Sequence, residues 1–130
     1  MRGGLLIGLN PDMWTRAAAL VVSLGGVKAG DPGRGVAQIE DATGRLFTMY
    51  ESLSARTDWA LDEGPFTVAD GVQLPDMGAV IGCDFECRSP DYVAEIARAI
   101  ALANNAPTWL LDSDDVVWDA RHVDPSAVTL

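Results

Sequence analysis

Two adjacent patterns in the last third of the chain restrict its fold most strongly. The segment from Ala79 to Cys87 has the period of a strand with one buried face, because apolar residues at every second position alternate with Gly82, Asp84 and Glu86. Ser89 and Pro90 follow as a cap residue and a first-turn proline, and a helical pattern then continues to Asn104. The apolar stripe of this helix consists of Val93, Ile96, Ala97, Ile100 and Ala101. We therefore predict a strand followed directly by an amphipathic helix.

Turn-forming residues divide the rest of the chain into further elements. The expected elements are a strand over 4–9, a helix over 11–24 capped by Asn10, an exposed loop over 27–35, a hairpin of strands 36–40 and 46–51, a second hairpin of 66–69 and 72–74 around Asp70-Gly71, a last hairpin of 108–112 and 116–118, and a turn at Asp124-Pro125. This order predicts an α+β fold, with two helices packed on one face of a mainly antiparallel sheet.

The length of 130 residues fits one domain that comprises residues 1–130. A chain of this size buries roughly two-thirds of its unfolded surface, and 48% of its residues are apolar, so we expect a core without disulfides or metal. No apolar run approaches the ~18 residues of a membrane span, and the N-terminus lacks a convincing cleavage site. We expect a cytoplasmic protein.

The charge of the chain is strongly negative and unevenly distributed. The net charge is −10, with four basic and two acidic residues in 1–39, and five basic and 17 acidic residues in 40–130. Phosphate contacts need a basic surface, so this composition argues against nucleic acid as a partner. It favours a basic protein partner, because a negative field steers such a partner toward the surface.

The sequence offers no convincing metal or redox site. Cys83 and Cys87 are predicted to point to the same side of one strand about 13 Å apart at ~3.3 Å per residue, too far for a disulfide. We interpret both as core residues. His122 is the only histidine, so we predict neither a metal nor a cofactor.

The candidate catalytic motifs lack residues that their chemistry requires, or have them at unsuitable positions. Leu110 to Asp114 superficially matches the start of a haloacid-dehalogenase-type phosphatase, but only 16 residues follow Asp114. The same acids do not form a calcium loop, because valines stand where a ligand and the turn glycine belong. His122, Asp124 and Ser126 lie on one short segment, which does not make a triad. We predict no catalytic residues. Two alternatives stay open: a small carboxylate-based hydrolase or ligand-binding domain, and a chaperone-like subunit of a secretion system.

Several acids are predicted to lie away from the core. Two are on the outer face of the 79–87 strand, and three crowd the turn of the last hairpin near a tryptophan, an arrangement suited to a basic partner. The predicted partner-binding residues are Asp84, Glu86, Asp112, Asp114, Asp115 and Trp118.

A family resemblance supports this interpretation. The segment Cys87-Arg88-Ser89-Pro90, the helix after it, Thr108-Trp109-Leu110-Leu111-Asp112 and Val117-Trp118 resemble small actinobacterial proteins of the immunity type, which are found beside polymorphic secreted toxins. The resemblance implies a small, acidic, cytoplasmic α+β protein that binds and blocks one toxin, often a basic nuclease or an NAD-consuming enzyme. It implies no catalytic residues.

Overall fold

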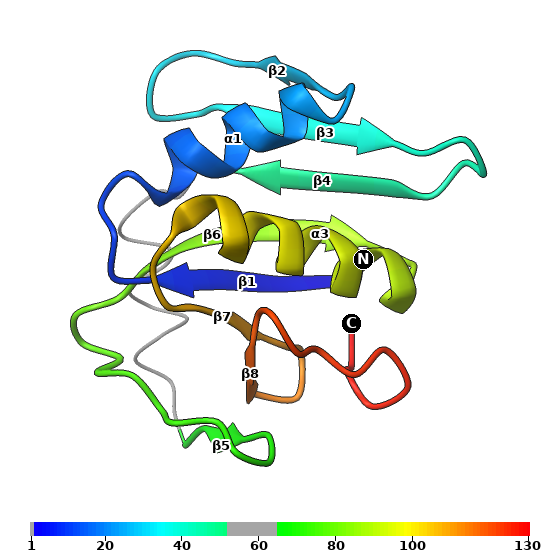
Figure 1. The fold of residues 1–130 in the computed structure, drawn as a ribbon. Coiled ribbons are helices and arrows are strands. Elements are labelled where there is room, and N and C mark those ends of the chain that lie inside the picture. Colours follow the sequence, from blue (N-terminus) through cyan, green and yellow to red (C-terminus); the bar gives the residue numbers. More distant parts are fainter. Residues whose placement is uncertain (1, 52–64) are drawn as a thin grey trace.

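The computed structural model describes residues 2–51 and 65–130, which form a sheet of eight strands with two helices on one face (Figure 1). The elements are β1 (Gly3–Gly8), α1 (Met13–Ser23), β2 (Val27–Ala29), β3 (Val36–Glu40), β4 (Leu46–Tyr50), β5 (Thr67–Val68), β6 (Ile81–Cys87), α3 (Pro90–Asn104), β7 (Thr108–Leu111) and β8 (Val116–Asp119). The strand order is β2-β3-β4-β6-β1-β7-β8-β5. Of the described strand pairs, β5 and β8 are parallel and the others antiparallel. The α+β prediction is confirmed.

The central strand β1 is buried on both faces. Leu6 belongs to the main core, which lies between the sheet and the two helices. Leu5 and Ile7 face the other way and form a second core with Val80, Leu111 and others, on which part of the segment 66–80 packs. Burial on both sides explains why β1 reads as a nearly continuous apolar run rather than an alternating one. Neither helix of the described residues combines the length and the apolar character needed to cross a bilayer.

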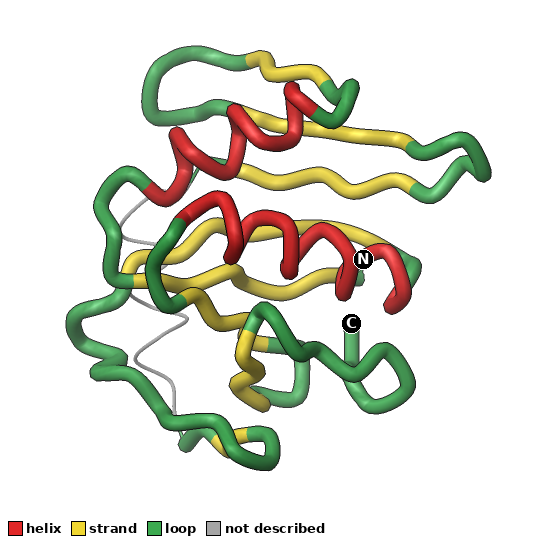
Figure 2. The backbone as a smooth tube through the Cα atoms, in the orientation of Figure 1, coloured by secondary structure: helices red, strands yellow, loops and turns green. Residues whose placement is uncertain are grey.

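The helix α3 has the predicted bounds, because each of its ends carries a local signal. The Ser89 hydroxyl accepts a hydrogen bond from the Tyr92 backbone N–H at 3.3 Å, and Pro90 occupies the first turn. At the other end Asn105 adopts a left-handed conformation with φ 49°, which asparagine tolerates better than most residues. All five predicted stripe residues are buried. Figure 2 shows α3 beside α1 on the same face of the sheet.

The helix α1 begins two residues later than predicted, at Met13 instead of Pro11. Asn10 does not cap the helix. Its side-chain oxygen instead accepts a hydrogen bond from the Asp12 backbone N–H at 2.9 Å, and its carbonyl accepts one from Met13 at 3.1 Å. Pro11 and Asp12 thus belong to a local turn, and the helix begins after it.

Two predictions about the sheet edges were also wrong. The 27–35 segment is not entirely loop, because β2 pairs with β3 as an edge strand with all of its residues exposed. The Asp70-Gly71 turn forms, with Gly71 at φ 76°, but no hairpin flanks it. β5 pairs with β8 instead, and Val72 packs on the second core. The two hairpins at β3–β4 and β7–β8 are confirmed.

Replacing the cap of α3 tests the account of its start. We expect Ser89→Ala to lower the free energy of unfolding by about 1 kcal/mol, because the Tyr92 N–H loses its acceptor. Ser89→Asp keeps an acceptor and should stay close to the wild type. Urea unfolding followed by circular dichroism measures both variants. Equal losses in the two variants would contradict this role of the hydroxyl.

Candidate functional site

The predicted partner-binding residues do not share one face of the sheet. Asp84 pairs with Leu5 across β6 and β1, so its side chain lies on the face opposite the helices, and Glu86 lies on that face too. Trp118 pairs with Leu110, which belongs to the core under the helices. The sheet therefore separates Asp84 and Glu86 from Trp118.

Asp112 is not part of the surface, and its prediction as an exposed partner-binding residue was wrong. Its side chain is only 4% exposed. One carboxylate oxygen accepts hydrogen bonds from the backbone N–H groups of Asp114 (2.9 Å) and Val116 (3.0 Å). The other accepts from the Trp118 indole N–H (3.0 Å) and the Thr129 backbone N–H (3.2 Å). Four donors thus satisfy the buried carboxylate, which ties the hairpin turn to the C-terminal segment.

The other two acids of this turn are exposed as predicted. Asp114 and Asp115 lie at the tip of the β7–β8 hairpin. Asp115 has φ 60°, a left-handed conformation that closes the turn. Its carbonyl accepts a hydrogen bond from Thr67 at 3.1 Å, which places the turn beside β5.

Further acids reach this edge of the molecule from segments that the sequence analysis did not combine. Asp70, Asp119 and Asp124 line a hollow of about 540 Å³, which also contains part of the half-buried Trp118. Asp70 follows β5, Asp119 is the last residue of β8, and Asp124 begins the last turn. The carboxylates of this edge, here called the acidic edge, are Asp70, Asp114, Asp115, Asp119 and Asp124. Asp119 is half-buried and the other four are exposed.

Local hydrogen bonds fix part of the acidic edge. Asp124 accepts bonds from the Ser126 hydroxyl (2.7 Å) and backbone N–H (2.9 Å), and these bonds lower the pKa of Asp124. The predicted turn at Asp124-Pro125 is thus confirmed. His122 instead lies 3.4 Å from a carboxylate oxygen of Asp119. Since Ser126 is bonded to Asp124 and not to His122, these residues do not have the order of contacts of a catalytic triad.

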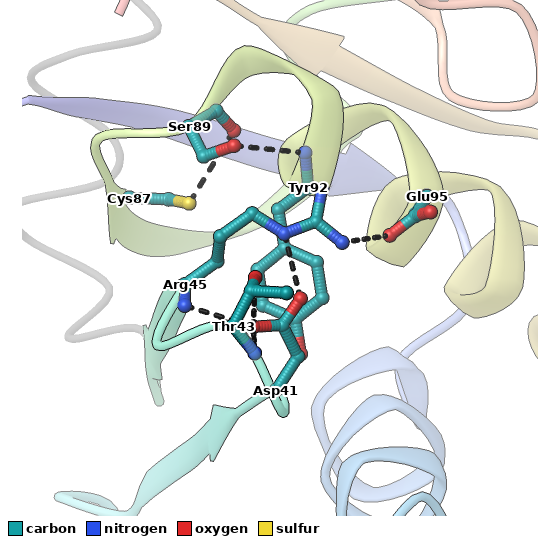
Figure 3. A network of polar contacts seen from close by, with 7 residues as sticks. All are labelled: Asp41, Thr43, Arg45, Cys87, Ser89, Tyr92 and Glu95. Carbon is teal, nitrogen blue, oxygen red and sulfur yellow. Dashed lines mark hydrogen bonds and ion pairs between the residues drawn. The ribbon is translucent and has the colours of Figure 1, made fainter.

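A second polar cluster joins the β3–β4 turn to α3 (Figure 3). The Arg45 guanidinium contacts Asp41 at 2.6 Å and Glu95 at 3.1 Å, and it lies over the Tyr92 ring at 4.7 Å. Asp41 also accepts hydrogen bonds from Thr43. Arg45 therefore connects the turn to the helix through charge and ring contacts together.

The same cluster shifts the pKa values of its members. Desolvation acts to raise the pKa of Asp41, but the hydrogen bonds from Arg45 and Thr43 outweigh it and lower the value from 3.8 to about 2. Burial raises the pKa of the Cys87 thiol, whose sulfur contacts the Ser89 carbonyl at 3.5 Å. Cys83 and Cys87 are both buried and not disulfide-bonded, as predicted. A buried, protonated thiol is a poor nucleophile.

Within residues 2–51 and 65–130, no group of three or more His, Cys, Asp or Glu side chains is arranged to hold a metal ion. Comparisons of the chain with protein families, with curated proteins and with solved structures find no match.

The pKa of Asp41 predicts a pH-dependent stability. Its folded-state pKa is lower than the ordinary value, so its contribution should be present above about pH 4 and be lost as the pH falls through about 2. The difference in unfolding free energy between wild type and Asp41→Asn should shrink over this range in urea titrations. Asp31→Asn, a change in an exposed loop, is the control. A difference that does not vary with pH would contradict the assignment.

Removing the Asp112 carboxylate should destabilise the chain far more than removing an exposed acid. Asp112→Ala leaves four N–H donors without their acceptor, so we expect a loss of about 3 kcal/mol or more. Asp114→Ala, at the exposed tip, should change stability by no more than about 0.5 kcal/mol. Tryptophan fluorescence during chemical unfolding reports both. Similar losses in the two variants would show that the Asp112 hydrogen bonds do not matter.

Proposed function

We propose that this chain is a non-catalytic binding protein of the immunity type, which neutralises a basic bacterial toxin domain through its acidic edge. The observation that carries the proposal is the gathering of five carboxylates from three separate segments at this edge, three of which line one hollow together with Trp118. Such a surface attracts a basic partner over a distance and suppresses acidic competitors. The resemblance of residues 87–118 to immunity-type proteins supports the choice of partner, and a cytoplasmic location belongs to the same proposal.

Trp118 is suited to be the anchor of the interface. It is half-buried, and its indole N–H is bonded to the buried Asp112, so the ring is held in one orientation before a partner arrives. A fixed aromatic ring loses little conformational entropy on binding. Tryptophan is also among the residues that most often dominate binding energy. In this proposal Asp112 is a positioning residue that orients Trp118, rather than a contact residue.

The shifted pKa values of two carboxylates bear on the role of a general acid in hydrolysis. Hydrogen bonds lower the pKa of both Asp41 and Asp124, so each is a carboxylate at neutral pH. A glycosidase-type general acid needs the opposite shift, because it must hold a proton near neutral pH. Neither residue suits that role.

The toxin proposal is tested with the protein encoded by the neighbouring gene. We expect that protein to arrest growth when expressed in a bacterial host, and co-expression of this chain to restore growth. The purified pair should form a complex that weakens with added salt, because charge contacts dominate. A neighbouring product that is harmless, or that does not bind, would overturn the proposal.

Neutralising the tip of the acidic edge should weaken this complex about tenfold, since each exposed charge contact contributes up to ~1 kcal/mol. The variant is Asp114→Asn with Asp115→Asn, because asparagine accepts the left-handed backbone at position 115. Asp31→Asn with Glu40→Gln removes two exposed charges from β3 and the loop before it, and is the matched control. Calorimetry measures both. Equal affinities of the two variants would mean that the acidic edge is not the interface.

A further inference from the structure

A hollow of about 580 Å³ lies where β1 and β4 begin and where β6 leads into α3. Three arginines line it, Arg2, Arg45 and Arg88, together with Glu86. The backbone of Arg2 is fixed beside β6, because its carbonyl accepts a hydrogen bond from the Cys87 N–H at 3.0 Å. In a chain with 19 acids and 9 bases, this is a local concentration of positive charge.

The three arginines are not equivalent. Arg45 is already paired with Asp41 and Glu95. Arg2 and Arg88 are exposed, and neither side chain forms a hydrogen bond or ion pair with another residue that the structure describes. Acids are abundant in this chain, so a shortage of partners does not explain why neither guanidinium is paired within residues 2–51 and 65–130.

We propose that this hollow binds a carboxylate anion through Arg2 and Arg88. Apart from Arg45, which is paired with Asp41 and Glu95, the charged residues that line the hollow are Arg2, Arg88 and Glu86. Two positive charges and one negative charge suit a monoanion better than a phosphate dianion. A guanidinium fork also matches the two oxygens of a carboxylate. The net charge of −10 opposes anions at long range, but screening limits this effect to about 8 Å at physiological ionic strength.

The site lies next to the tip of the acidic edge and does not depend on it. Leu5 pairs with Leu111 across β1 and β7, and Gly3 pairs with Glu86 across β1 and β6. The arginines and the β7–β8 turn therefore lie at the same end of the sheet, on either side of the start of β1. A partner that carries an acid beside its basic residues could contact both, yet the carboxylate site stands whether or not a toxin binds.

NMR titration of the arginine Nε–Hε signals with sodium acetate, at constant ionic strength, tests the site. We expect saturable shifts at Arg2 and Arg88 and none at Arg98, an exposed arginine on α3. Arg2→Gln or Arg88→Gln should each weaken acetate binding about two- to fivefold, and the double variant should lose it. Arg98→Gln should leave binding unchanged. Unsaturable shifts, or equal shifts at Arg98, would overturn the proposal.

Two further titrations identify the class and source of the anion. Phosphate binding more tightly than acetate would overturn the assignment to a carboxylate. A blocked Gly-Glu-Gly peptide that binds as well as acetate would support the proposal with a protein side chain as the source. If acetate binds and the peptide does not, the carboxylate proposal is supported and the source of the anion is a free organic acid. Because none of these probes contacts a toxin, failure here is distinguishable from failure of the proposed function.

Discussion

The pairing of β1 with β6 on one side and β7 on the other is the constraint on which the rest of the structure depends. The first strand of the chain lies between two strands that follow it by more than 70 residues. Its close contacts leave little room for side chains, since a Cβ at Gly3 would collide with the Phe85 carbonyl oxygen. Through this strand, and through the pairing of β4 with β6, the second half of the chain is joined to the first. Arg2 and the tip of the acidic edge, Asp114 and Asp115, lie at the end of the sheet where β1 starts.

Elements with local signals could be predicted from the sequence, and elements defined by distant partners could not. Ser89, Pro90 and Asn105 determine the ends of α3 from within or beside the helix, so its bounds were correct. The strand β2 has only exposed residues and no apolar period, and it was not predicted. The strand β5 lies within the predicted strand over 66–69, but its partner was predicted wrongly. Both are strands only because β3 and β8 supply hydrogen-bonding partners. A sequence pattern cannot reveal such pairing.

The candidate site was predicted in part for the same reason. Strand alternation correctly placed Asp84 and Glu86 away from the main core. Asp112 looked like its exposed neighbours, but its burial depends on donors that include Thr129, 17 positions further on. The acidic edge combines residues from three segments, and the pairing of β5 with β8, which brings Asp70 close to Asp119, was not predictable locally.

The sheet order places the acidic edge at one side of the sheet and β2 at the other. Lys28 and Arg34 are exposed at or beside β2, where Asp31 and Glu40 are exposed as well, so the β2 side has no comparable excess of acids. The acidic edge accompanies β5 and β8 at the opposite side of the sheet. In the proposed function, this uneven charge turns the acidic edge toward a basic partner during approach, so part of the orientation needed for docking is reached before contact. In the same proposal, the indole ring of Trp118, already fixed by Asp112, is the aromatic contact that this edge offers to the partner.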